Sequence, residues 1–94
     1  MNRQNFKNNT TGFKGVICQR GKWHTRIEKY GRFYHLGFQT DLKTAALVYD
    51  YAAMRLFGAQ YVWRNLPEQP ISLDVVTLVE FHLSKHGLLI ASPD

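Results

Sequence analysis

Two glycines, Gly21 and Gly31, divide the stretch from residue 13 to residue 38, which is rich in aromatic and β-branched residues, into three short segments. Within these segments apolar and polar residues alternate, a period that is typical of β-strands with one buried face. Two-residue hairpin turns require positive backbone φ angles, which glycine adopts without cost. The stretch therefore predicts a meander of three antiparallel strands with a hairpin turn at each glycine.

The register of this sheet follows if each glycine is the second residue of a two-residue turn. Val16 then faces Thr25, and Ile27 faces Tyr34. Slipping either hairpin by one residue would move large apolar side chains to the polar face, so this register is favoured. The face expected to pack in the core holds Val16, Cys18, Trp23, Thr25, Ile27, Tyr34, Leu36 and Phe38, with Lys14 at its open end.

The opposite face of the sheet is expected to stay open and to be basic. Its charged and polar side chains alternate with small or apolar ones, and turn residues Arg20, Lys29 and Arg32 surround it. Guanidinium groups can bind phosphates or the guanine edge, and glycines would let a nucleic-acid backbone approach closely. The predicted members of this face are Phe13, Gly15, Ile17, Gln19, Lys22, His24, Arg26, Glu28, Phe33, His35 and Gly37.

After the sheet, the apolar spacing changes from two to three and four, which indicates helices. The first helix is expected over residues 41 to 57, with Thr40 as its N-cap and Gly58 in the left-handed conformation after its end. It can cover one face of a three-stranded sheet. Its small side chains allow a close approach to that face: Ala45, Ala46, Ala52 and Ala53.

A second helix is predicted over residues 73 to 86, opened by Ser72 and closed by Gly87. Its apolar stripe is expected to contain Val76, Val79 and Leu83. The fold class is therefore α+β: a three-stranded antiparallel sheet packed on one helix, with an additional C-terminal helix. We divide the chain into a flexible polar arm (1–12), a sheet-and-helix domain (13–67) and a C-terminal helical extension (68–94).

The charge of +5 is unevenly distributed. Residues 1 to 38 hold eight Lys or Arg and one Glu, a net charge of +7, whereas residues 39 to 94 hold four basic and six acidic residues, a net charge of −2. A basic half on a small chain attracts polyanions, of which nucleic acid is the commonest. The single cysteine forms no internal disulfide, and the chain shows no run long enough to cross a bilayer, so we expect an intracellular protein.

Four segments, TTGFKGV, KWHTRIEKYGRFYHLGFQT, AALVYDYAAMRLFG and RNLP, resemble in this order the Apetala/ethylene-response-factor DNA-binding domain. The resemblance covers about residues 9 to 67. It implies a three-stranded sheet that enters the major groove of double-stranded DNA. The short hairpins resemble the form found in bacterial and phage HNH homing endonucleases. That likeness implies a cytoplasmic or nucleoid location and a nuclease or integrase domain preceding this one in a parent protein.

The resemblance also implies which residues contact DNA: Lys14, Gly15, Ile17, Gln19, Lys22, Arg26, Glu28, Phe33 and His35. Ile17 and Gln19 stand where plant members tend to have Arg, and His35 replaces a Trp, so the plant target sequence does not transfer. Asp50 corresponds to a residue that supports structure. We assign base reading to Arg26, His35 and Gln19. Phosphate contacts are assigned to Lys14, Arg20, Lys22, Lys29 and Arg32, and Arg3 and Lys7 of the arm are expected to follow the backbone or a minor groove.

The alternative is a protein-interaction module that uses either the sheet or the helix. Phe13, Ile17 and Phe33 would form the patch on the sheet, and Leu47, Tyr51 and Met54 the patch on the helix. The second helix is expected to pack on the helix patch and leave the sheet free. We expect a monomer without catalytic activity, cofactor or metal, because His24 and His35 lack an evident third ligand and no catalytic motif is recognised.

Overall fold

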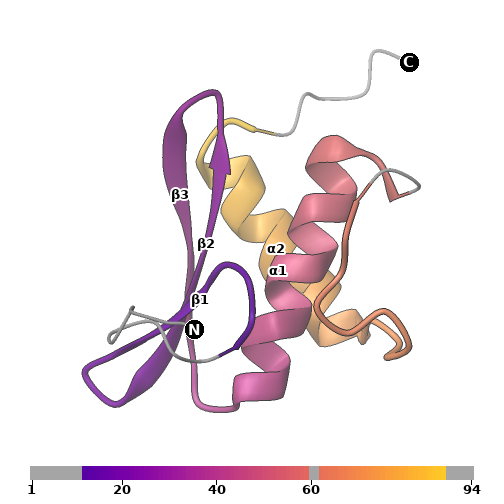
Figure 1. Cartoon of the computed structure of the whole chain (residues 1–94). Coiled ribbons are helices and arrows are strands. Elements are labelled where there is room, and N and C mark those ends of the chain that lie inside the picture. Colours follow the sequence, from indigo (N-terminus) through magenta and orange to yellow (C-terminus); the bar gives the residue numbers. More distant parts are fainter. Residues whose placement is uncertain (1–11, 60–61, 89–94) are drawn as a thin grey trace.

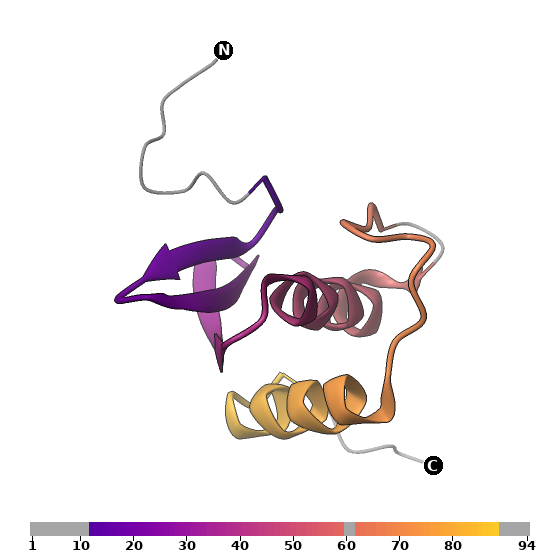
Figure 2. The ribbon, with the colours of Figure 1, turned by 90° about the horizontal axis from the view of Figure 1, so that it is seen from below.

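The computed structural model describes residues 12–59 and 62–88, so the predicted arm residues 1–11 lie outside it. Strands β1 (Val16–Gln19), β2 (Lys22–Lys29) and β3 (Arg32–Gln39) form one antiparallel sheet in the order β1-β2-β3 (Figure 1). Helices α1 (Leu42–Phe57) and α2 (Leu73–Lys85) follow. The predicted α+β fold is confirmed. Both helices lie on the same side of the sheet (Figure 2), but the C-terminal end of α2 reaches β3, where His82 lies next to Gly37 and lines a cavity together with His24 and His35.

Both predicted hairpin turns are present. Arg20 and Gly21 have φ angles of 55° and 77°, and Tyr30 and Gly31 have φ angles of 57° and 77°. Two successive positive φ angles define the turn type whose twist matches that of the flanking strands. Arg and Tyr are uncommon at such angles, so the pairing of the strands imposes these turns against the local preference of two residues.

The predicted register is confirmed throughout the first hairpin, where Val16 pairs with Thr25. In the second hairpin it holds from the turn to the pair of Arg26 and His35, and it is wrong beyond that point. His24 pairs with Phe38, so β3 contains one extra residue there, a β-bulge next to Gly37, whose φ is +95°.

The bulge corrects the predicted place of Phe38. One extra residue reverses the side to which every later side chain points. Phe38 therefore stacks on His24, at a distance of 4.7 Å between ring centroids, and leaves 53% of its surface exposed instead of entering the core.

Cys18 is a second correction, because it is exposed and not in the core. It faces the partly buried Trp23 across the first hairpin. The hairpin tip is formed by exposed residues on both strands, Gln19 and Lys22 among them. The alternating pattern placed the Cys18 side chain on the correct side of β1, but the hydrophobic core does not extend to this end of the strand.

The helix caps differ from prediction at the first helix and agree at the second. Asp41, not Thr40, caps α1, since its carboxylate accepts from the backbone N–H of Thr44 at 2.7 Å. Gly58 ends α1 with a φ of 96° and a ψ of 125°, which is outside the left-handed helical region. Ser72 caps α2 as predicted. The helix ends one residue earlier than expected, at Lys85.

The core lies between the sheet and the two helices. The four alanines of α1 are buried as predicted, and Thr25 donates from Oγ1 to the carbonyl of Ala45 at 3.0 Å. From α2, Val75, Val79 and Leu83 join the same apolar cluster as Leu47, so Val75 replaces the predicted Val76 as the first member of the stripe.

The predicted packing of α2 on the Leu47 side of α1 is confirmed. Tyr51 of α1 donates a hydrogen bond to Glu80 of α2 at 2.7 Å, and Arg55 forms an ion pair with the same carboxylate. Hydrogen bonding to Arg55 holds the pKa of Glu80 below its ordinary value. The contact between the helices therefore has an apolar centre and a charged edge. Neither described helix has the length and apolar character needed to cross a membrane.

Candidate nucleic-acid interface

The open face of the sheet displays side chains that the alternation placed there. Gln19, Lys22, Glu28, Phe33 and His35 are exposed, and Ile17 and Arg26 are partly exposed. We call this set, together with the exposed Lys14, the open face. It carries two lysines and one arginine against one carboxylate, so its net charge is positive.

Arg26 lies at the centre of the open face and is held over an aromatic ring. Its guanidinium carbon is 4.3 Å from the centroid of the Phe33 ring on the neighbouring strand. Stacking orients the planar group and limits its motion while its N–H donors remain available. Within residues 12–59 and 62–88 the ion pairs formed at 4.0 Å or less are Arg55–Glu80 and Arg64–Asp50, so Arg26 has no carboxylate partner there.

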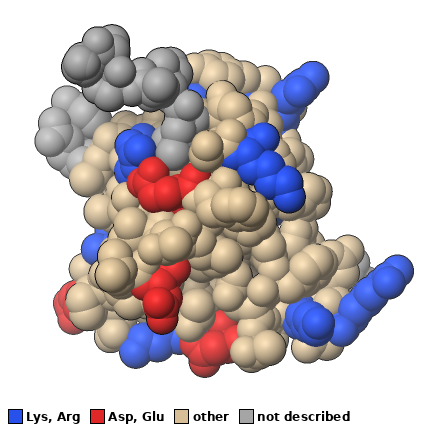
Figure 3. All heavy atoms as spheres, turned by 180° about the vertical axis from the view of Figure 1, so that it is seen from behind, with Lys and Arg blue, Asp and Glu red and all other residues tan. Residues whose placement is uncertain are grey.

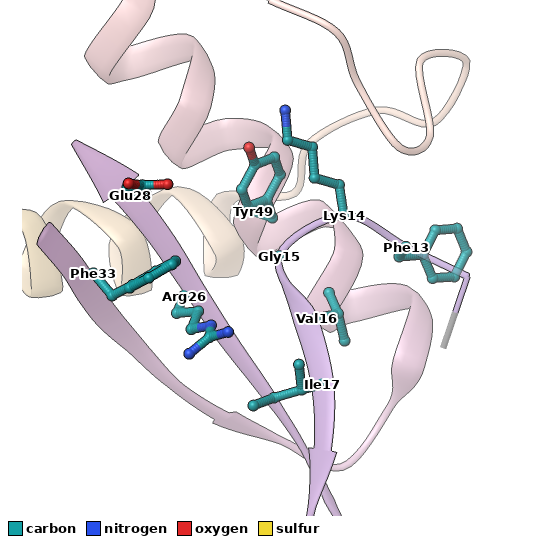
Figure 4. Close-up of a pocket in the computed structure, with 9 residues that line it drawn as sticks. All are labelled: Phe13, Lys14, Gly15, Val16, Ile17, Arg26, Glu28, Phe33 and Tyr49. Carbon is teal, nitrogen blue, oxygen red and sulfur yellow. The ribbon is translucent and has the colours of Figure 1, made fainter. Parts of the chain in front are cut away.

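A cavity of about 220 Å³ opens beside Arg26, between β2 and the chain that leads into β1 (Figure 4). The backbone N–H of Arg26 donates to the carbonyl of Gly15 at 2.9 Å, so the two segments remain joined ahead of the start of β1. The residues lining the cavity are Phe13, Lys14, Gly15, Val16, Ile17, Arg26, Glu28, Phe33 and Tyr49. At the edge of the open face, the cavity thus places apolar surface next to basic side chains and to the carboxylate of Glu28.

Lys14 is positioned by Asn65, a residue more than fifty positions away. The amide oxygen of Asn65 accepts from the backbone N–H of Lys14 at 2.8 Å, and its Nδ2 donates to the Lys14 carbonyl at 3.0 Å. One side chain thereby imitates the pairing of a neighbouring strand. Sequence reasoning missed this role, although Asn65 belongs to the RNLP segment that carries part of the family resemblance.

Asn65 is in turn held by the buried carboxylate of Asp50 on α1. That carboxylate accepts from the backbone N–H groups of Asn65 at 2.6 Å and Leu66 at 2.8 Å. Arg64 lies 3.7 Å from it and supplies the compensating charge. The structural role predicted for Asp50 is confirmed: it fixes the segment that fixes Lys14.

His24 lies on the predicted side of the sheet but is only 4% exposed, which corrects its place in the candidate contact surface. His35 and Phe38 stack on it, with a distance of 4.6 Å between the two imidazole centroids. Burial lowers the pKa of His24 most, and electrostatic interactions with His35 and Arg26 lower it further. His24 is therefore a neutral group beneath the surface and does not reach a docked DNA edge directly.

The basic residues predicted at the rim divide into two groups. Arg20, Lys22 and Arg32 are exposed, and basic side chains project at the two corners that hold the hairpin turns (Figure 3). Lys29 instead donates from Nζ to the carbonyl of Leu56 at the end of α1, at 3.2 Å. Its ammonium group is therefore bound on the helix side of the sheet, and a phosphate contact would have to compete with this hydrogen bond.

The two glycines expected to admit a nucleic-acid backbone have packing roles in the structure. A Cβ atom on Gly15 would lie 2.1 Å from Cδ1 of Tyr49, and one on Gly37 would lie 3.1 Å from Nε2 of His82. Both glycines also have positive φ angles. The protein itself therefore requires glycine at these positions, whether or not DNA approaches them.

Among the described residues, no group of three or more His, Cys, Asp or Glu side chains is arranged to hold a metal ion. Comparison of the chain with known protein families and with curated protein sequences gives no match. The resemblance to the ethylene-response-factor domain therefore stays an interpretation of four sequence segments, and the case for function depends on the open face.

Proposed function

We propose that this protein is a DNA-binding module that inserts the open face of its three-stranded sheet into the major groove. The observation that carries the proposal is a separation of charge. The two ion pairs of the described residues join the helices and the segment between them, whereas Lys22 and Arg26 on the open face have no acidic partner there. Uncompensated positive charge on an exposed part of the surface attracts a polyanion.

The dimensions of the sheet suit this docking mode. At about 3.3 Å per residue, the eight residues of β2 extend roughly 23 Å from Lys22 to Lys29. The major groove is about 12 Å wide and admits a helix or a small β-ribbon. With the middle of β2 in the groove, the two hairpin tips would reach the phosphates on either side.

Roles follow from place and chemistry. Arg26 and His35 lie toward the middle of the sheet, and Gln19 lies beside the first hairpin turn. All three are assigned to base edges, with Arg26 suited to the O6 and N7 atoms of guanine. Arg20, Lys22 and Arg32 at the tips, with Lys14 on the first segment, are assigned to phosphates. The family resemblance favours sequence-specific binding, either in transcription control or as the targeting part of an endonuclease.

The test is binding to a labelled random-sequence duplex, measured by fluorescence anisotropy over a series of salt concentrations. Each neutralised phosphate contributes about −0.9 to the slope of log K against log salt, so a slope of about −4 to −6 is expected. Selection of tight binders from the same pool should then enrich a defined sequence. Absence of binding at low salt contradicts the proposal.

Two lysine variants provide a matched comparison within this experiment. Lys22→Ala should weaken binding to all sequences and reduce the magnitude of the salt slope by about 1. Lys43→Ala removes the same charge from the exposed surface of α1 and should leave the slope unchanged. Equal effects of both variants would mean that net charge alone, and not the open face, attracts DNA.

One observation favours a second candidate function, a protein-interaction surface. Phe33 and Phe38 are each 53% exposed on the open side of the sheet. Exposed aromatic side chains are common in the centres of protein interfaces. A protein partner bound through this side would lose affinity in Phe33→Ser and retain it at high salt, the reverse of the salt dependence expected for DNA.

A further inference from the structure

Two histidines on the open side of the sheet are joined directly to each other. Nε2 of His24 and Nδ1 of His35 are 2.7 Å apart, and the two residues lie in neighbouring strands on either side of the bulge. A neutral imidazole has one N–H donor and one acceptor nitrogen, so one ring must donate to the other. The direction of this hydrogen bond decides what His35 offers to a ligand.

The buried environment of His24 decides that direction. Its other nitrogen, Nδ1, is buried and has no hydrogen-bond partner among the described residues. If Nε2 accepted the hydrogen bond, the proton would sit on Nδ1 as a buried N–H without an acceptor, which is rarer and costlier than an unpaired acceptor. His24 therefore donates from Nε2, and His35 accepts at Nδ1.

The surroundings of His24 oppose its protonation. The cavity of about 350 Å³ beside the two rings is lined by His82 and Lys85 of α2, by the C-cap residue His86, by Gln19 of β1 and by Phe38. No acidic residue is among its described lining residues. Arg26 adds positive charge from the same strand as His24. Without a carboxylate to stabilise an imidazolium, the neutral form of His24, whose pKa is lowered by burial, is favoured near pH 7.

The backbone of His35 is held as well as its ring. Nε2 of His86 lies 2.9 Å from the carbonyl oxygen of His35 and can donate to it, and the ring of Tyr34 packs edge-on against His86. The C-terminal turn of α2 thus braces the strand segment that carries His35. This contact gives the C-terminal extension a part in shaping the open face.

We propose that His24 is a positioning residue that fixes exposed His35 as the tautomer with its proton on Nε2, so that His35 reads a hydrogen-bond acceptor on a base edge. In the major groove, guanine offers two acceptors, N7 and O6, adenine offers N7 and thymine O4, whereas cytosine offers only a donor. Guanine is therefore the expected base opposite His35. This inference deepens the proposed function and rests on it for the identity of the ligand.

The first measurement is the tautomeric state of the histidines in the unliganded protein, from long-range ¹⁵N–¹H correlation spectra near pH 7.5. The expected result is protonation at Nε2 in both His24 and His35. A proton on Nδ1 of His35 overturns the inference. Because this spectrum is recorded without DNA, its outcome is separate from that of the DNA-binding experiment.

The second measurement is selection of bound sequences with two variants of His24. His24→Phe keeps an aromatic ring between His35 and Phe38 but removes the donor, so His35 is free to adopt either tautomer. Discrimination at one base position should fall by roughly fivefold, the effect of one hydrogen bond. His24→Gln keeps an N–H donor and should restore most of that preference together with the Nε2 tautomer.

The outcomes separate clearly. Unchanged base preference in His24→Phe overturns the positioning role even if the tautomer is as expected. A uniform loss of affinity for all sequences in that variant also contradicts it, since such a loss indicates a phosphate contact or a damaged fold. Failure of the parent protein to bind any DNA overturns the base-reading role along with the proposed function, while the spectrum still reports the tautomer.

Discussion

At the scale of single residues, glycine positions in this protein are determined by two separate causes. Gly31 needs its positive φ angle for a hairpin turn, and a Cβ atom there would meet nothing within 4 Å. Gly15 has a similar φ angle of +82° and in addition lies against the ring of Tyr49. Turn glycines can be recognised from the local pattern, whereas contact glycines depend on a distant side chain.

A comparison of two substitutions tests this distinction. Gly31→Ala should cost about 1 to 2 kcal/mol of unfolding free energy, because alanine resists the left-handed region. Gly15→Ala should cost about 1 to 3 kcal/mol more, because its methyl group also displaces the Tyr49 ring. Urea denaturation of both variants provides the measurement. Equal losses would show that Tyr49 moves aside without cost.

At the scale of elements, the segment between the helices connects α1 to the entry of β1. Asp50 holds the backbone of Asn65, and Asn65 pairs with the backbone of Lys14. This chain of hydrogen bonds passes from the buried face of a helix to an exposed residue of the candidate interface. A conformational change in the segment would therefore change the position of Lys14.

The variant Asn65→Ala is expected to lower the unfolding free energy by roughly 1 to 3 kcal/mol, since it leaves two backbone groups of Lys14 without their partner. The backbone N–H of Lys14 should also lose its protection against hydrogen exchange. Thr77→Ala, a truncation at an exposed position of α2, is the control and should change neither quantity. Retained protection at Lys14 would show that strand β2 alone orders this segment.

At the scale of the whole molecule, all four histidines gather around one cavity where the C-terminal turn of α2 meets β3. Burial is the main cause of the lowered pKa values of His24 and His82. His35 and Arg26 add to the effect at His24, and Lys85 and His86 add to it at His82. Residues of the sheet and of the C-terminal end of α2 thus together create an environment that disfavours the protonation of His24 and His82.

Stability should consequently depend on pH in a defined direction. Both histidines have folded-state pKa values below their ordinary value of 6.5, so the unfolded chain takes up protons first as pH falls. Stability is therefore full above pH 6.5 and decreases below it, until the pH reaches the folded-state pKa values. The urea midpoint should be lower at pH 5.5 than at pH 7.5.

His24→Phe provides the control for this pH dependence, because it removes one of the two groups. The difference between the two midpoints should shrink, because only His82 then contributes a lowered pKa. Measurements above pH 5.5 avoid the titration of Glu80, whose pKa is lowered and whose contribution is lost only in more acid solution. A midpoint that rises toward acid pH would contradict the assignment.

The sequence by itself determined the strands, both hairpin turns, the cap of α2, and the separation of a packed face from a basic open face. These features depend on local spacing, on backbone angles at glycines and on side chains within a turn of each other, all of which a linear pattern records. The basic character of the interface belongs to this group, since alternation assigns Lys22 and Arg26 to one side without knowledge of their neighbours.

Only the tertiary structure decided where that alternation is interrupted and which side chains are covered. The bulge that turns Phe38 outward, the burial of His24, the binding of Lys29 to α1 and the link from Asp50 to Lys14 all join residues distant in the chain. Such contacts depend on how far the helices extend over the sheet and on which polar groups must find partners when packed. The local periodicity of the sequence does not record the extent of the helices over the sheet or the partners of buried polar groups. Both depend on how elements that are separate in the chain pack together.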